Sequence, residues 1–328
     1  MDRTFLFSNL NEYNYNPLND VLFKFIFGKE ERKQITIDFL NAVLESDISH
    51  PIKDLSFAST EMNPEHENDK LTRLDVSCVL DTGEQVDVEV QVVNEQNMER
   101  RSLFYWAQMY LMSLPAGKLY DDLKPAITIN LLDFNFLPQK EPHAIYGIYN
   151  QANGHQLTKD LSLHFLEIPK YANQPTKPIT QMTKMERWLA YFANQLDSRG
   201  KEELAMNETA IQNAMEAARL FLNSTEERRQ YINREMARMD YESRLQLEHR
   251  EGFQKGCEEG RKKGLLEGRQ EGLQEGRQEG RQEGRQEEAI RFSKLIQMLL
   301  SKGDMNEINA VTSDPTKREV LYEKYHIT

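Results

Sequence analysis

Hydrophobic and polar positions follow two different periods along the first part of the chain. Apolar residues recur at helical spacing over residues 17–28 and 29–46, which predicts two helices. They alternate with polar residues over 72–80 and 84–93, which predicts two strands. Helical spacing returns over 94–114, where we expect one buried apolar face. Its members are Leu103, Trp106, Ala107, Tyr110, Leu111 and Leu114.

The rest of the chain divides into further strands and then helices. Short apolar runs predict strands at 126–132, 144–149 and 162–168, and the chain then reads as helical from Pro178 to about residue 245. We therefore expect an α/β fold, with a mixed sheet flanked by helices, followed by an all-helical C-terminal half. The predicted regions are an α/β domain (1–175), a helical region (176–247), a glycine-repeat helix or linker (248–288) and a small helical unit (289–328).

The two strands around residue 82 predict a hairpin that gathers carboxylates. Residues 81–83, Asp-Thr-Gly, suit a loop closed by a glycine with positive φ. This register places Ser77 opposite Asp87, Asp75 opposite Glu89 and Arg73 opposite Gln91. Asp75, Asp87 and Glu89 then share one face, and valines occupy the other.

Carboxylates this close repel each other, and a bound divalent cation would remove the repulsion. Oxygen ligands without nearby Cys or His favour Mg²⁺ or Mn²⁺. The alternative is an amphipathic hairpin whose acidic face is simply solvated.

Charge changes the picture of possible partners. The formal net charge is −12, and residues 1–170 hold 26 acidic against 15 basic side chains, a net of −11. This sign opposes nucleic-acid binding over the whole surface, so any contact with DNA has to be local.

The apolar runs are far shorter than the roughly 20 residues of a membrane span. Cys78 and Cys257 show no pairing or metal-ligand spacing, which favours a cytoplasmic protein.

Glycine recurs every fourth residue from Gly252 to Gly284, nine times in all. Nine glycines inside a helix cost about 7–9 kcal/mol relative to alanine, so an isolated helix should fray. One interpretation is a partly helical spacer. The other is a helix whose glycine stripe packs against a second chain, which would make the protein a homo-oligomer through its C-terminal region.

Several segments together resemble a known family. They are NPLNDVLFKFIFG (16–28), RLDV (73–76), VEVQ (88–91), ERRSLFYWAQMY (99–110) and the glycine-repeat tail. In this order they resemble the recombination-promoting nuclease/putative transposase family of bacteria, which has a PD-(D/E)XK restriction-endonuclease-like core. The resemblance implies a Mg²⁺-dependent DNA endonuclease that hydrolyses phosphodiester bonds during recombination or transposition.

The resemblance also implies roles for individual residues. Asp75 and Glu89 would hold the metal and act in catalysis together with Gln91, which replaces the lysine of the general motif. Glutamine can orient groups only through neutral hydrogen bonds. Asp20, on the first predicted helix, fits the acidic residue that completes the metal shell in this superfamily. It could equally be an ordinary helix-start residue.

Four basic residues are candidates for binding DNA, namely Lys24, Arg73, Arg100 and Arg101. Lys24 shares a helix face with Asp20, so it could contact phosphate or pair with Asp20. Arg101, with Tyr105 and Gln108, lies along the polar side of its helix, which could also be an ordinary solvated face. Two other functions remain open, a nuclease-derived DNA-binding module that has lost its chemistry and a self-assembling interaction protein.

Overall fold

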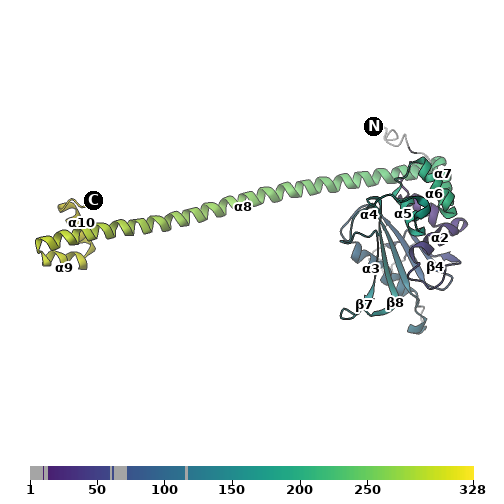
Figure 1. Ribbon diagram of the computed structural model, residues 1–328, viewed down its shortest axis with the longest axis horizontal. Coiled ribbons are helices and arrows are strands. Elements are labelled where there is room, and N and C mark those ends of the chain that lie inside the picture. The colour runs from purple at the N-terminus through teal and green to yellow at the C-terminus, as the bar shows by residue number, and fades with distance from the viewer. Residues whose placement is uncertain (1–9, 11–13, 60, 63–71, 115–116) are drawn as a thin grey trace. The chain divides into compact units, whose positions relative to one another are not determined.

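The computed structural model describes residues 10, 14–59, 61–62, 72–114 and 117–328 (Figure 1). The chain divides into two compact units, Met1–Arg244 and Leu245–Thr328. The first unit contains a mixed sheet with flanking helices, and the described residues of the second are helical. The predicted fold class is therefore confirmed.

Within the described residues, six strands form the main sheet in the order β1-β4-β5-β6-β8-β7. Its centre is parallel, because β5 and β6 pair in parallel and so do β6 and β8, whereas the outer pairs are antiparallel. A short pair, β2 (Glu61–Met62) and β3 (Thr72–Arg73), lies outside it. The main strands are β1 (Leu55–Phe57), β4 (Val76–Leu80), β5 (Gln85–Gln91), β6 (Ala126–Leu132), β7 (His143–Tyr149) and β8 (Gln156–Glu167).

The β4–β5 hairpin has the predicted loop and register. Gly83 adopts φ +99°, and its N–H donates to the Leu80 carbonyl at 2.9 Å. A residue with a Cβ would be strained there, which explains the glycine. Ser77 lies opposite Asp87, as predicted. The predicted pairing of Arg73 with Gln91 is wrong, because Arg73 lies opposite Glu61 in the β2–β3 pair.

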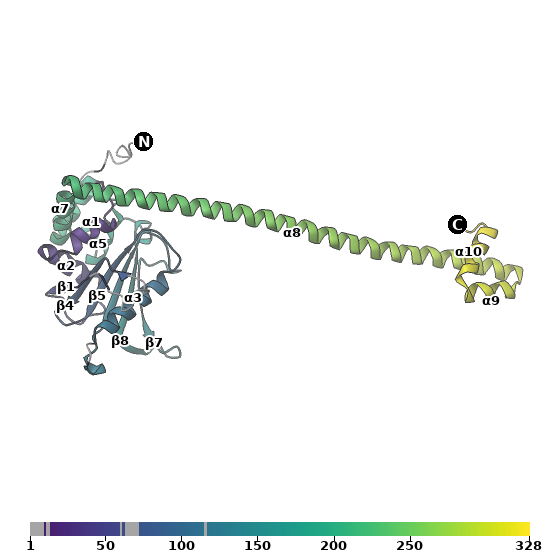
Figure 2. The same cartoon turned by 180° about the vertical axis from the view of Figure 1, so that it is seen from behind.

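Helices cover both faces of the sheet. Alternate residues such as Val86 and Val88 point into a core shared with α1, α2, α5 and α7. The centre of this core is aromatic, and α3 covers the opposite face of the sheet (Figure 2). The first-unit helices are α1 (Asp20–Phe27), α2 (Lys33–Val43), α3 (Met98–Met112), α4 (Ile168–Ala172), α5 (Lys184–Ala193), α6 (Ser198–Asn207) and α7 (Thr209–Asn223), and the 3-10 helices are η2 (Glu30–Arg32), η3 (Tyr120–Asp122) and η4 (Ile179–Gln181).

The predicted buried face of α3 is partly wrong. Trp106 and Tyr110 are partly buried, but Leu103 and Leu111 are exposed by 46% and 76%. The face of α3 that is buried against the sheet instead contains Met98, Ser102 and Met109, and Ser102 Oγ donates to Asn130 Oδ1 at 3.0 Å. The physical reason is that this sheet face carries both polar and apolar side chains, so that buried polar groups find polar partners while the two methionines pack in apolar clusters.

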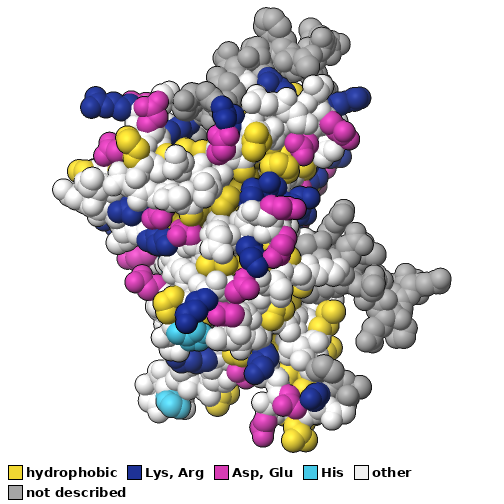
Figure 3. Space-filling view, turned by 90° about the vertical axis from the view of Figure 1, so that its right-hand side faces the viewer, with side chains coloured by type: hydrophobic (Ala, Val, Ile, Leu, Met, Phe, Trp, Pro, Cys, Tyr) yellow, Lys and Arg dark blue, Asp and Glu magenta, His cyan; other side chains and the backbone are white. Residues whose placement is uncertain are grey.

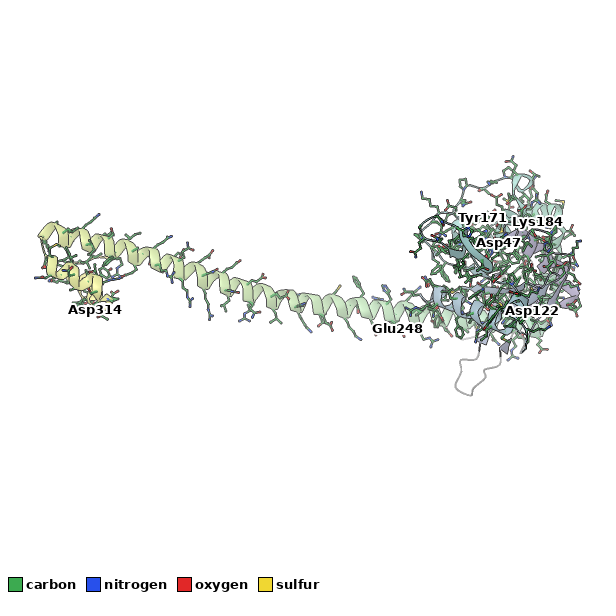
Figure 4. The ribbon with its side chains drawn as sticks, turned by 90° about the horizontal axis from the view of Figure 1, so that it is seen from below. Asp47, Asp122, Tyr171, Lys184, Glu248 and Asp314 are labelled. Atoms are coloured by element: carbon green, nitrogen blue, oxygen red, sulfur yellow. The ribbon has the colours of Figure 1, made fainter. Side chains whose placement is uncertain are left out.

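Helix α8 (Thr225–Lys302) begins in the first unit and continues into the second. Residues 246–287 are all exposed, including Glu248 (Figure 4). A Cβ added at any of the nine repeat glycines would meet nothing within 4 Å. The end of α8 packs with α9 (Met305–Ser313) and α10 (Pro315–Lys324) around a small core. Its members are Leu295, Leu299, Val311, Leu321, Tyr322 and Ile327.

Among the described residues, no helix is both long and apolar enough to span a bilayer.

Candidate active site

Two carboxylates interlock where β4 begins beside the end of β5. The backbone N–H of Asp75 donates to Glu89 Oε1 at 3.0 Å, and the Val90 N–H donates to Asp75 Oδ2 at 2.9 Å. Asp75 stands in a bend just before β4, so it reaches Glu89 through these side-chain bonds and not through the strand ladder. The structure therefore brings the two residues together by a different contact from the one the hairpin register predicts.

The acidic face of the hairpin is buried under α3. Asp87 and Glu89 are 0% and 2% exposed, so the alternative of a solvated acidic face is wrong for these two residues. Burial raises the pKa of Glu89 to about 8, with a further contribution from Asp75 that Arg101 opposes. Burial also raises the pKa of Asp87 well above its usual range, and the charges of Glu89 and Asp75 add to this.

Asp87 is a buried carboxyl that forms no hydrogen bond with any residue in the described part of the chain. Ser77 and Thr128 lie beside it on the neighbouring strands, but neither of its oxygens bonds to them. The Thr128 hydroxyl is likewise buried and without a partner. A carboxylate in such a place is costly unless it is protonated or faces a cation.

Arg101 and Gln91 hold Glu89 from the side of α3. Arg101 Nη2 donates to Glu89 Oε2 at 3.1 Å, and its Nη1 donates to Gln91 Oε1 at 3.1 Å. Gln91 Nε2 in turn donates to the same Glu89 oxygen at 3.2 Å. The Arg101 guanidinium also lies over the Tyr105 ring, 5.2 Å from its centroid. Arg101 is thus part of the carboxylate cluster and not on a solvated helix face.

Lys24 approaches the same cluster from α1. Its Nζ lies 2.9 Å from Asp75 Oδ1, so Lys24 pairs with Asp75 and not with Asp20. An ammonium group therefore stands at the carboxylates even though position 91 is a glutamine. Asn19 caps α1 by accepting the Leu22 N–H at 3.3 Å, which fixes the start of the helix that carries Lys24.

Of the remaining predicted site residues, Asp20 and Arg100 make none of the cluster contacts described above. The Asp20 carboxylate pairs with Arg234 of α8 at 2.8 Å. Arg100 is exposed on α3, and the side chain of Arg73 lies outside the described part of the structure. Asp20 nevertheless lines the same hollow as Asp75.

That hollow has a volume of about 650 Å³, and its wall includes the beginning of α8. We call it the α8 hollow. It is lined by Asp75, Gln91, Arg101, Arg234, Arg238 and Arg244, among others.

A sequence model of the PD-(D/E)XK nuclease family transposases matches residues 17–248, which include the whole cluster and its hollow. The chain belongs to this family. No curated protein and no solved structure matches the chain. Membership of the PD-(D/E)XK nuclease family transposases indicates a function related to nucleases or transposases.

PD-(D/E)XK nucleases typically use divalent metals, and the donors of this cluster fit such an ion. Asp75 and Glu89 offer only oxygen ligands, which suit Mg²⁺ or Mn²⁺, and Asp87 adds an unbalanced carboxyl beside them. Among the described residues, no three Asp, Glu, His or Cys side chains form a ready-made metal cluster. The suitability of this site for a divalent metal ion therefore depends on the Asp75–Glu89 pair.

The sequence indicates one contributor to the site of this family member only in part, and a second not at all. The alternation of side chains places Asp87 among the three carboxylates of the hairpin face, but it does not indicate that Asp87 is fully buried and without a hydrogen-bond partner among the described residues. The arginines of α8 carry no local signal, because their contact with α1 joins residues more than 200 positions apart, as in the Asn19–Glu235 hydrogen bond of 2.7 Å.

Proposed function

We propose that this protein is a metal-dependent DNA endonuclease that hydrolyses phosphodiester bonds, in the setting of recombination or transposition. The observation that carries the proposal is the interlocked Asp75–Glu89 pair, which lies beside Arg101 and Lys24 at the edge of an open hollow. Carboxylates next to cationic side chains are the groups that metal-assisted phosphoryl chemistry requires.

Asp75 and Glu89 would hold Mg²⁺ or Mn²⁺, and Asp20 is the predicted additional ligand. A bound divalent ion supplies Lewis-acid polarisation of a phosphate and a lower pKa for a coordinated water molecule. Its positive charge would also balance Asp87, which has no hydrogen-bond partner among the residues that the structure describes.

The chain's own side chains would bind and orient the substrate. Lys24 can contact a phosphate oxygen while it remains close to Asp75, because an ammonium group has three donors. Arg101 and Gln91 keep Glu89 in one orientation through their three hydrogen bonds. Gln91 cannot take a proton from water, so its contribution is positional.

A plasmid-nicking assay with Mg²⁺, Mn²⁺ or EDTA tests the proposal on the wild type and on Asp75→Ala. We expect metal-dependent nicking by the wild type and at least a 100-fold loss in the variant, roughly the effect of losing one key electrostatic group. Asp121→Ala is the matched control, because Asp121 is an exposed carboxylate in η3. Equal nicking by all three proteins, or none by the wild type, would contradict the proposal.

A second candidate is a nuclease-derived protein that binds DNA or assembles with itself without efficient catalysis. It is favoured by the ion pairs Lys24–Asp75 and Arg101–Glu89, which satisfy the two carboxylates without any ligand, and by Gln91 in place of lysine. In that case Asp75→Ala would change DNA binding little, and neither Mg²⁺ nor Mn²⁺ would produce nicking.

A further inference from the structure

The first turns of α8 form one wall of the hollow that contains the carboxylate cluster. Arg234, Arg238, Tyr241 and Arg244 line it from α8. All four lie in the first unit, which ends at Arg244. Tyr231 and Glu235, on the same stretch, are 3% and 5% exposed, so this part of α8 is firmly packed against the fold.

The local charge of the α8 hollow differs from that of the chain as a whole. Residues 1–170 carry a net charge of −11, and acidic and basic side chains are interspersed on the face seen in Figure 3. The hollow instead has more basic than acidic lining residues. The basic ones are Lys24, Arg101, Arg234, Arg238 and Arg244, and the acidic ones are Asp20, Asp75, Glu95 and Glu235.

The basic residues differ in how many donors they have left for a ligand. Arg238 uses all three of its nitrogens on Glu235 and Glu242. Arg234 uses only its Nε, which donates to Asp20 at 2.8 Å.

Arg244 is exposed, and its guanidinium lies 5.8 Å from the centroid of the Tyr241 ring. Within the described part of the chain, no carboxylate contacts Arg244 or the terminal nitrogens of Arg234. These two arginines therefore have donors that an anion can use.

We propose that Arg234 and Arg244 bind the phosphates of one DNA strand beside the carboxylate cluster. Ten residues of helix separate them, a rise of about 15 Å. This distance corresponds to about four nucleotides at roughly 3.4 Å per nucleotide of one strand. Arginine suits the task, because its planar donors match phosphate oxygens. This local contact gives an acidic protein a way to bind DNA, and it rests on the proposed function for its substrate class.

The test is the salt dependence of binding between the full-length protein and a labelled DNA duplex, measured by fluorescence anisotropy in EDTA. Each lost phosphate contact should reduce the slope of log affinity against log salt by about 0.9. Raising salt from about 50 to 200 mM should therefore weaken binding about 3.5-fold less in Arg244→Ala than in the wild type. Arg234→Ala should show the same change.

Two further variants separate phosphate binding from structural effects. Arg229→Ala removes an exposed arginine of α8 that does not line the hollow, and it should keep the wild-type slope. Asp20→Ala breaks the same ion pair as Arg234→Ala but leaves the arginine in place. Its slope should not fall, whereas matching losses in Asp20→Ala and Arg234→Ala would show that the ion pair matters only for structure and would overturn the role of Arg234.

Nicking and binding give independent outcomes. An unchanged slope in Arg244→Ala, in a preparation whose wild type nicks DNA with Mg²⁺, overturns this inference and leaves the endonuclease in place. A reduced slope in a protein that never nicks supports the inference and contradicts only the catalytic proposal.

Discussion

At the scale of single residues, the uncompensated carboxyl of Asp87 determines how the metal-free protein should respond to pH. A carboxyl whose pKa is raised by folding holds its proton more tightly in the folded state than in the unfolded chain. Its contribution to stability is therefore lost as the pH rises from the pKa of the unfolded chain to the pKa of the folded protein. Asp87 and Glu89 both behave in this way, and for Glu89 the folded pKa is about 8.

We therefore predict that Asp87→Asn stabilises the protein in EDTA at neutral pH. The asparagine has nearly the same shape and no charge, so the free energy of unfolding should rise by roughly 1–3 kcal/mol. The gain should shrink as the pH falls and should vanish below about pH 3, where the wild-type carboxyl is protonated in both the folded and the unfolded state. Urea denaturation at several pH values measures this. An equally large gain at low and neutral pH would contradict the electrostatic cause.

The residue scale also shows what the sequence can and cannot predict at the site. The register of Asp87 follows from the loop and the alternation of side chains, and it is confirmed. The contact between Asp75 and Glu89 is expected across a ladder, but the chain bends at Asp75 and the side chains bond to backbone N–H groups. The alternation of polar and apolar residues along a strand does not indicate the residue at which its pairing with the neighbouring strand ends.

At the scale of elements, the sheet edge near β7 contains a hydrogen-bonded chain of side chains. His143 Nε2 lies 2.9 Å from His164 Nδ1, and His164 Nε2 lies 3.0 Å from Asp47 Oδ2. Ser162 bonds to the same Asp47 oxygen. Asp47, labelled in Figure 4, lies in the turn that follows α2, so these hydrogen bonds join β7 and β8 to a turn that is far away in sequence.

The protonation of His143 in this group of side chains predicts how the stability of the protein changes at mildly acidic pH. Burial and the neighbouring His164 lower the pKa of His143 to about 4, from an ordinary value near 6.5. Between these values the unfolded chain takes up a proton that the folded protein does not, so stability falls as the pH falls. We expect His143 to contribute a loss of about 2 kcal/mol between pH 6.5 and 5, measured by near-UV circular dichroism in urea as the difference between the wild type and His143→Gln, because Asp87 and Glu89 change the stability in the opposite direction over the same interval.

His143→Gln should remove this contribution while keeping a polar side chain at the position, so that the variant loses less stability than the wild type, or gains more, as the pH falls from 6.5 to 5. Asp47 contributes only at lower pH. Although burial opposes the effect, bonds from His164 and Ser162 lower the pKa of Asp47 to about 2. Its stabilising effect is therefore lost only below its ordinary value near 4. An unchanged slope above pH 5 in His143→Gln would contradict the assignment.

Elements are easier to predict than their environments. The range of β6 is predicted correctly, because an apolar run bounded by turn residues is typical of a buried strand. The strand β8 begins at Gln156, earlier than residue 162, because its first residues pair with β7 while remaining partly exposed. The predicted face of α3 is partly wrong for a tertiary reason, since the sheet below it carries buried polar side chains beside apolar ones, and Ser102 pairs with one of the polar groups.

At the scale of the whole molecule, the glycine repeat is the feature that the sequence leaves open. In the structure it is part of one helix, and no atom lies near the missing Cβ of its glycines. Steric space therefore gives no reason for glycine at these positions. The cost in helix stability remains, about 0.8–1 kcal/mol for each glycine.

We predict that replacing Gly268, Gly272 and Gly276 together with alanine raises the helix content of the full-length protein. The gain in helix stability should be roughly 2–3 kcal/mol, because each added methyl group meets open space. Far-UV circular dichroism and limited proteolysis would detect it. Light scattering supplies the control, since a drop in oligomer size would show instead that the glycines pack against another chain.

The four-residue period of residues 252–284 also has a consequence for insertions and deletions. A whole four-residue unit can be added or removed without changing the pattern of the repeat. Each added GRQE unit would extend the helix by about 6 Å and rotate its C-terminal end by about 40°. The arginines that line the hollow precede the repeat, so such changes would leave them in place. The length of α8 can thus change by whole units without altering the residues of the carboxylate cluster.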